Sequence, residues 1–268
     1  MSIDTLGLRE QKKRETRRAI SDHATQLFLQ RGFDRTTIAD IAGAARVAKM
    51  TVTNYFPRKE DLALDHHEAF VAGLAEAVAR RPPGESALGA VRRAYAHALE
   101  QRDPVIGFTG RDFARMVAGS PTLVTRLRDL HDQREEALAG ALAAETHAAA
   151  LDESATAGTP EAARTSYDTA ARAAVHGGEE TAGESQGGTP AAGVEGDIEG
   201  DIEGDTVVAR AVAAQLAAAD RLLFRELQRR TLAGQDDDEI AGALAEAARR
   251  VFDLLEPAIG GYAVRRPA

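Results

Sequence analysis

The sequence predicts an all-α protein, with a three-helix helix-turn-helix head, a helical body and a long, acidic, low-complexity insertion within that body. Apolar residues recur at helical spacing along most of the 268 residues. Cap residues, glycines and prolines separate these periodic segments, and no segment alternates convincingly as a strand would. The chain contains no cysteine, which excludes disulfide scaffolds, thiolate metal sites and cysteine nucleophiles.

Charge is distributed very unevenly along the chain. The formal net charge is -9, but residues 1–60 carry 12 Lys and Arg against 7 Asp and Glu and hold all four lysines. Residues 152–206 carry 2 Arg against 13 acids. A basic head beside an acidic tract indicates a nucleic-acid partner that the net charge conceals. No apolar run approaches the roughly 20 residues that cross a bilayer, so we expect a cytoplasmic protein without membrane contact.

The basic head predicts one long helix and two short ones. A helix over about 10–31 has one apolar face and ends at Gly32, where a left-handed cap is expected. That face is formed by Ile20, Ala24, Leu27 and Phe28. Thr37 precedes Asp40 by three residues, the spacing of a capping box at the start of a second helix. A third helix is expected over about 48–55.

The rest of the chain predicts a body of longer helices. A helix after Pro57 should run unbroken from about 59 to 80, a length of about 33 Å, and so link the head to the body. Ser120 before Pro121 is a typical helix start, and the last helix should end before Pro257. Further helices are expected at 85–102, 109–118, 121–150, 207–232 and 238–256.

Residues 152–206 interrupt this pattern. The segment contains ten glycines, two prolines and a repeat of Gly, Asp, Ile and Glu over 196–205. Such a composition buries too little apolar surface to offset the entropy lost on ordering. We therefore expect a mostly disordered acidic loop here.

Two short helices joined by a tight turn, inside a basic segment, are typical of a helix-turn-helix DNA-binding domain. The stretches TTIADIA over 36–42 and VAKMTVTNYFPRKEDL over 47–62 closely resemble the signature of the TetR family of bacterial transcriptional regulators. This resemblance implies a DNA-binding domain over 1–58 and a ligand-binding and dimerisation domain over 59–268. It further implies a homodimer on a palindromic operator, an unknown small-molecule effector and no cofactor, with repression released by the ligand.

The resemblance also implies roles for individual head residues. Lys49 can donate to guanine, and Met50 can contact a thymine methyl group. Asn54 fits either a DNA contact or a solvated position. Contacts to backbone phosphates are implied for Thr37, Thr51, Tyr55 and Lys59. Arg46 and Thr53 differ from the family pattern, but each can still reach a phosphate.

Four head positions depart from the common family pattern, namely Ala39, Arg46, Ala48 and Thr53. Arg46 replaces the turn glycine, so either the turn is reshaped or Arg46 adopts a left-handed conformation at a cost of about 1 kcal/mol. Ala48 replaces the usual serine cap, which leaves the third helix without a side-chain cap.

The body helices suggest a ligand pocket and a dimer interface, although ordinary core packing is an alternative for both sets. Candidate pocket residues are Phe70, Leu74, Tyr95, Leu99, Phe108, Phe113, Met116, Leu127 and His131. Candidate dimer residues lie on the apolar stripes of the last two long helices and are Val212, Leu216, Leu223, Leu244, Val251 and Leu254.

Two other classes of protein are alternatives to a DNA-binding regulator. An enzyme is not expected, because the chain lacks a P-loop and the GxGxxG, GxSxG and HExxH motifs. No metal site is expected, because the adjacent His66 and His67 point to different helix faces. A helical dimeric adaptor or activator that uses the acidic segment is the alternative, and the basic N-terminal helix speaks against an adaptor without DNA binding.

Overall fold

The structure is a computed structural model that describes the backbone of residues 3–157 and 194–265 and the side chains of residues 7–148 and 206–265. Within these ranges it contains helices and no strand, which confirms the all-α prediction. No helix there combines the length and apolarity needed to cross a bilayer. The helices are α1 Ile3–Arg31, α2 Ile38–Ala44, α3 Lys49–Tyr55, α4 Lys59–Ala63, α5 His67–Ala79, α6 Ala87–Glu100, η1 Pro104–Ile106, α7 Arg111–Gly119, α8 Pro121–Ala157, α10 Val194–Ala233 and α11 Asp237–Ile259.

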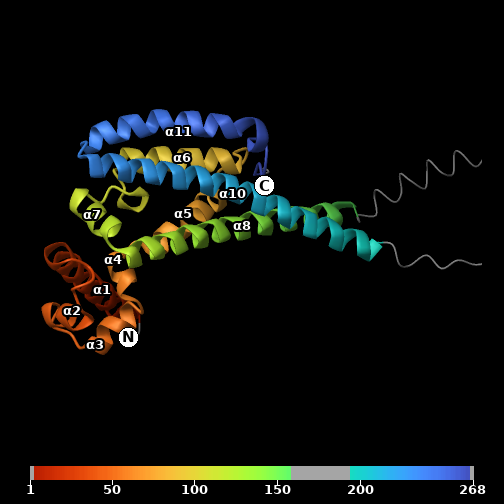
Figure 1. Ribbon diagram of the computed structural model, residues 1–268. Coiled ribbons are helices and arrows are strands. Elements are labelled where there is room, and N and C mark those ends of the chain that lie inside the picture. Colours follow the sequence, from red (N-terminus) through yellow and green to blue (C-terminus); the bar gives the residue numbers. More distant parts are fainter. Residues whose placement is uncertain (1–2, 158–193, 266–268) are drawn as a thin grey trace, which may run out of the picture.

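Two clusters of buried apolar side chains organise the fold. One lies among α1 to α4, and it also takes in Leu123 from the start of α8. The other lies among α5, α6, α8, α10 and α11. In Figure 1 the first four helices form a small unit at one end of the body, and α8 and α10 run side by side through the body and beyond it.

The helix expected over 59–80 is broken in two, which corrects the sequence prediction. Helix α4 ends at Ala63 and α5 begins at His67. Leu64 has φ -111° and ψ 54°, outside the helical region. The Asp65 carboxylate accepts a hydrogen bond from the Ser21 hydroxyl of α1. The link between head and body is therefore a bend beside α1 rather than one rigid rod.

Three helix ends in the body also differ from the sequence prediction. Helix α11 continues through Pro257 to Ile259, and the burial of Ile259 in the body core holds the last turn in place. Helices α8 and α10 extend into the expected loop, over 152–157 and 194–206. Adding turns to an existing helix costs less than nucleating one, which offsets the poor helix propensity of the glycines. The rest of the expected loop, 158–193, lies outside the described residues.

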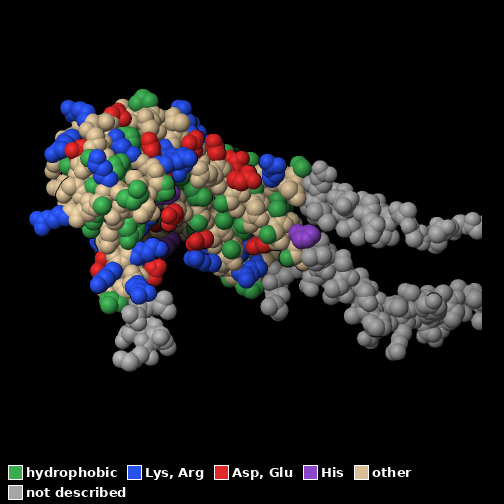
Figure 2. All heavy atoms as spheres, turned by 90° about the horizontal axis from the view of Figure 1, so that it is seen from below, with side chains coloured by type: hydrophobic (Ala, Val, Ile, Leu, Met, Phe, Trp, Pro, Cys, Tyr) green, Lys and Arg blue, Asp and Glu red, His purple; other side chains and the backbone are tan. Residues whose placement is uncertain are grey.

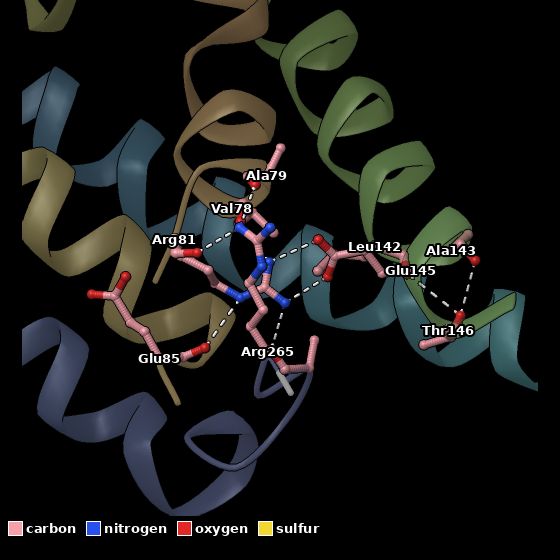
Figure 3. Close-up of polar contacts among 10 residues, drawn as sticks. Val78, Ala79, Arg81, Glu85, Leu142, Ala143, Glu145, Thr146 and Arg265 are labelled. Carbon is pink, nitrogen blue, oxygen red and sulfur yellow. Dashed lines mark hydrogen bonds and ion pairs between the residues drawn. The ribbon is translucent and has the colours of Figure 1, made fainter. Parts of the chain in front are cut away.

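A buried arginine ties the end of α5 to α8 and to the C-terminal segment. The Arg81 side chain is 2% exposed, and its two terminal nitrogens lie 2.8 and 2.5 Å from the carboxylate oxygens of Glu145. It also donates to the carbonyl oxygen of Ala263 at 2.7 Å. Arg265 donates in turn to the carbonyl oxygens of Ala79 and Arg81 (Figure 3). These acceptors offset the free energy that the Arg81 charge loses on leaving water. They hold together the end of the body that lies away from the head (Figure 1).

Candidate nucleic-acid interface and cavity

A capping box starts α2, as the sequence predicts. The Thr37 hydroxyl accepts from the Asp40 amide at 3.2 Å, and the Thr37 amide donates to the Asp40 carboxylate at 2.8 Å. The Thr37 hydroxyl also lies 2.6 Å from the same carboxylate, and these hydrogen bonds lower the pKa of Asp40. Thr37 is exposed at the surface of the head, so its hydroxyl remains accessible to a phosphate.

The turn between α2 and α3 keeps the left-handed conformation that usually calls for glycine. Arg46 has φ +54°, so the turn is not reshaped around the larger residue. The amide of the next residue, Val47, donates to the carbonyl oxygen of Ala42 at 3.0 Å and closes the turn. The Arg46 side chain is exposed, which leaves its guanidinium accessible to solvent or a ligand.

Helix α3 presents a polar face to solvent. Ala48 occupies its N-cap and makes no side-chain hydrogen bond, as expected from the missing serine. Lys49, Thr53 and Asn54 are exposed, and Met50 is 69% exposed although its side chain is apolar. The opposite face is buried in the head core through Val52, and Phe56 follows the helix into the same core.

Two further residues proposed to contact phosphates, Thr53 and Lys59, have partners within the chain. The Thr53 hydroxyl donates to the carbonyl oxygen of Met50 at 3.1 Å, and Thr51 and Tyr55 are half-buried. The Lys59 ammonium lies 4.1 Å above the Phe33 ring, and partial burial lowers the pKa of Lys59. Lys59 therefore stabilises the head as well as offering a charge at its edge.

Sequence reasoning missed the role of Arg17 in the head. Its Nη1 donates to the carbonyl oxygen of Tyr55 at 3.1 Å, and its guanidinium carbon lies 4.5 Å from the centre of the Phe56 ring. Its other terminal nitrogen lies 3.4 Å from the Glu68 carboxylate. Arg17 thus joins α1 to the end of α3 and to α5. Lys and Arg side chains also surround the N-terminal end of α1 (Figure 2).

A cavity of about 730 Å³ lies in the body beside the bend between α4 and α5. Its walls come from that bend, from η1 and the residues after it, and from α7, α8 and α10. Four predicted pocket residues line it, namely Phe70, Phe113, Leu127 and His131. Among the others, Leu74, Tyr95 and Leu99 are buried in the body core, Phe108 packs against that core, and Met116 packs against the head core, so none of these five lines it.

The cavity has one wall that the sequence reasoning did not find. Arg221, Phe224, Arg225 and Gln228 of α10 line it, whereas 207–232 was interpreted only as a dimerisation helix. Phe224 interrupts a helix otherwise rich in alanine and leucine, which is the signal that could have indicated a second role.

Three rings form an aromatic cluster in this wall. The ring centres of Phe70 and His131 are 4.9 Å apart, those of His131 and Phe224 are 5.2 Å apart, and both pairs pack edge to face. Burial, with the nearby charges of Arg221, Arg134 and Arg225, lowers the pKa of His131 to about 4. His131 is therefore neutral at physiological pH and forms part of an uncharged aromatic surface.

A buried ion pair supports this cluster from behind. Arg134 and Asp220 are 5% and 6% exposed, and Arg134 Nε lies 3.1 Å from an Asp220 carboxylate oxygen. Arg134 also donates to the carbonyl oxygen of Phe70, and its guanidinium lies 4.5 Å from the centre of that ring. Burial raises the pKa of Asp220, while Arg134 opposes that shift. The pair fixes Phe70 against the cavity.

Comparisons with known proteins agree with the sequence and geometry of the head. Residues 20–65, which span the packed head from α1 to the bend, match the family described as bacterial regulatory proteins of the tetR family. The head of this chain is therefore similar to that family. It is 32% identical over 143 residues to the HTH-type transcriptional regulator TcmR of Streptomyces glaucescens. That alignment covers 52% of this chain and 63% of TcmR, so the chain spans less than two thirds of the relative.

Two solved TetR-family structures were also compared with this chain. A regulator from Streptomyces coelicolor is 21% identical with a TM-score of 0.37, over 89% of this chain and 94% of the other. NalD, described as the secondary repressor of a multidrug efflux pump in Pseudomonas aeruginosa, is 16% identical with a TM-score of 0.40, over 90% and 97%. Because both TM-scores are below 0.5, neither structure contributes to the assignment.

Contacts connect the cavity directly to the head. Asp65 lines the cavity and accepts the hydrogen bond from Ser21 of α1. Val117 of α7 lines the cavity and also packs against the head core, which includes Leu123 of α8. Ser120, between α7 and α8, donates to Asp34 of the head at 3.3 Å. A change in cavity shape therefore has several short routes to α1.

The residues expected at the dimer interface occupy different environments. Val212, Leu216, Leu223 and Leu244 are buried in the body core of the single chain, so they are not on the surface that a second copy could reach. For these four residues the single chain shows the core packing that the sequence left open as the alternative. Val251 is half-buried and Leu254 is 79% exposed. Leu222 of α10 is 52% exposed and was not predicted.

The histidines that were weighed as metal ligands also lie at the cavity. His66 and His67 line it at the bend between α4 and α5. His67 Nδ1 lies 2.9 Å from the carbonyl oxygen of Leu64, and His66 Nε2 lies 3.7 Å from Asp65. Among the residues with described side chains, no three potential ligands gather in a group that could hold a metal ion.

Proposed function

We propose that this chain is a transcriptional repressor that binds a palindromic operator as a homodimer and is released by a small molecule in the body cavity. In this proposal residues 1–58 form the DNA-binding domain, and residues 59–268 bind the ligand and the second copy. The observation that carries it is the exposed face of α3, held on the head core by a tight turn at Arg46.

The chemistry of that face suits the major groove of DNA. Lys49 can donate to guanine O6 or N7, and the exposed Met50 can contact a thymine methyl group. Asn54 is exposed one helical turn beyond Met50 and can contact a base or a phosphate. Arg46 can reach a phosphate from the turn, and further phosphate contacts are assigned to Thr37, Thr51, Thr53, Tyr55 and Lys59.

The dimer would use the outer faces of α10 and α11. Leu222 and Leu254 are large exposed apolar side chains on these two helices. Two-fold pairing of this surface would place two copies of α3 about one turn of DNA apart. The ligand would act through the bend between α4 and α5, where Asp65 touches both the cavity and α1.

The proposal is tested by selecting DNA from a random pool and by mobility shift with the region upstream of the gene. The expected site is an inverted repeat whose half-sites lie about one helical turn apart. Lys49→Ala and Asn54→Ala should weaken binding to the selected site. Arg80→Ala, at an exposed position directly after α5, is the control and should not. A pool without enrichment, or equal loss for all three variants, would contradict the proposal.

A further inference from the structure

The charges around the cavity are unevenly matched. Four arginines line it, Arg128 on α8 and Arg221, Arg225 and Arg229 on α10, whereas Asp65 is its one acidic lining residue. Two of these arginines are neutralised locally. Arg221 lies 3.2 Å from Glu135 and 3.4 Å from Asp132, and Arg229 lies 2.7 Å from Glu226.

Arg128 and Arg225 have no such partner. Within the side chains that the structure describes, Arg128 makes no ion pair or hydrogen bond, and Arg225 donates only to the carbonyl oxygen of Arg221 at 3.3 Å. Asp65 forms an ion pair with neither of them, and its single negative charge offsets at most one of the two. Positive charge therefore remains available on two helices of the cavity wall.

The environment of His131 agrees with positive charge at Arg225. The charges of Arg221, Arg134 and Arg225 add to burial in lowering the pKa of His131, which lines the same wall. A positive potential at a buried, neutral ring favours an anion nearby and disfavours a cation. Cationic ligands are therefore poorly suited to this cavity.

The remaining wall is apolar and aromatic. Phe70 and Phe224 lie with their ring centres 5.9 Å apart at an interplanar angle of 71°, and Phe113 lines the cavity from α7. Such surfaces favour flat aromatic groups, which pack edge to face or stack on them. The cavity, at about 730 Å³, is large enough for a ligand of two or three fused or linked rings.

We propose that the effector of this protein is an aromatic organic anion, with its rings against Phe70, Phe113 and Phe224 and its acidic group at Arg128 and Arg225. The inference rests on the proposed function only in taking this cavity as the effector site. It gives the chemical class of the ligand, a carboxylate, sulfonate or phenolate on an aromatic frame. Guanidinium groups bind such anions through charge-assisted hydrogen bonds.

The test uses two fluorescent probes that share one ring system. 1-Anilinonaphthalene-8-sulfonate carries a sulfonate, and N-phenyl-1-naphthylamine is the same frame without it. The chain contains no tryptophan, so probe emission can be followed without interference from indole. We expect the sulfonate to bind at least about tenfold more tightly than the neutral probe, and only its affinity should fall as salt is added.

Substitutions of the two unpaired arginines test where the sulfonate group binds. Arg128→Gln and Arg225→Gln should each weaken sulfonate binding about tenfold and leave the neutral probe within about twofold. Arg80→Gln removes an equal charge at an exposed site outside the cavity and should change neither affinity. Phe224→Leu should weaken both probes. Circular dichroism melting curves establish that each variant is folded before titration.

Either of two results would overturn the inference. One is equal affinity for the two probes, and the other is sulfonate binding that Arg128→Gln and Arg225→Gln leave unchanged. Because these titrations contain no DNA, they are independent of the proposed function. If the chain binds DNA but prefers the neutral probe, only this inference is contradicted. If the chain prefers the sulfonate as expected but enriches no DNA site, only the proposed function is contradicted.

Discussion

Arg126 of α8 forms a nearly buried ion pair with Asp61 of α4, with Nη2 2.8 Å and Nε 3.0 Å from the same carboxylate oxygen. The two side chains are 11% and 8% exposed. Arg126 directly precedes Leu127 and Arg128, which line the cavity, and Asp61 directly precedes Leu62 of the head core. The pair is therefore a direct contact between the helix that lines the cavity and the head.

Breaking this pair from one side should be costly. Arg126→Leu leaves the Asp61 carboxylate desolvated without a partner, so we expect the free energy of unfolding to fall by about 3 kcal/mol. The double variant Arg126→Leu with Asp61→Leu should lose less, since no charge is left buried alone. Urea denaturation of the two single variants and the double variant measures the coupling, and additive losses would contradict it.

Lys49 and Lys59, the two lysines of the proposed DNA-contact surface, should contribute differently to DNA binding. Lys49→Ala should relax base preference at one position of the site, at a cost of about 1 to 3 kcal/mol. Lys59→Ala should weaken all DNA sequences alike and reduce the salt slope of binding by about one. Mobility shifts on specific and random DNA at several salt concentrations separate these effects.

Lys59 has a second expected effect, on stability. Its ammonium lies over the Phe33 ring, so Lys59→Ala should lower the free energy of unfolding by about 0.5 to 1 kcal/mol. Lys49 is exposed and makes no such contact among the described residues, so Lys49→Ala should leave the unfolding midpoint nearly unchanged. Equal stability losses for the two variants would contradict this difference.

Glycine at position 46 should separate stability from DNA binding. The left-handed conformation of Arg46 costs about 1 to 2 kcal/mol, which exceeds the entropy that glycine loses on folding, about 0.5 to 1 kcal/mol. Arg46→Gly should therefore stabilise the head by about 0.5 kcal/mol and weaken DNA binding through the lost phosphate contact. Thermal melting and mobility shift on the same preparation test both parts, and a destabilised Arg46→Gly variant would contradict the strain argument.

Two leucines distinguish the proposed dimer surface from the core. Leu254→Arg changes an exposed side chain, so the chain should stay folded while its dimer dissociates at higher concentration. Leu223→Arg places a charge in the body core and should unfold the chain instead. Light scattering and circular dichroism are the measurements, and a Leu254→Arg variant with an unchanged dimer would move the interface elsewhere.

The head was predictable in detail because its structure depends on local chemistry. Thr37 and Asp40 form the capping box, Ala48 lacks a cap, and Arg46 occupies the turn, all within a few residues of one another. The break near Leu64 was not predictable, since no proline or glycine stands there and the bend depends on Asp65 meeting Ser21, 44 residues away. Local periodicity contains no information about such a contact.

The body shows the same limit at larger scale. Helical periodicity identified the apolar stripe of α10 correctly but not the surface it meets. Leu216 and Leu223 were expected at a dimer interface, and they are buried in the core of the single chain. Phe224, the next residue, lines the cavity. Different faces of α10 contribute to the core and to the cavity, and the role of each face depends on which helices pack against it.

The buried histidine of the cavity predicts a pH dependence of stability. The pKa of His131 is about 4 in the folded chain and near 6.5 when unfolded, so below pH 6.5 the unfolded state binds more protons. The contribution of His131 to the free energy of unfolding is fully present above pH 6.5 and decreases as the pH falls toward 4. Between pH 7.5 and pH 5 the loss should be about 2 kcal/mol. His131→Gln, which cannot titrate, should show a smaller loss over the same range by that amount. Urea denaturation at both pH values gives the comparison, and equal losses for the wild type and the variant would show that His131 is accessible to protons in the folded chain.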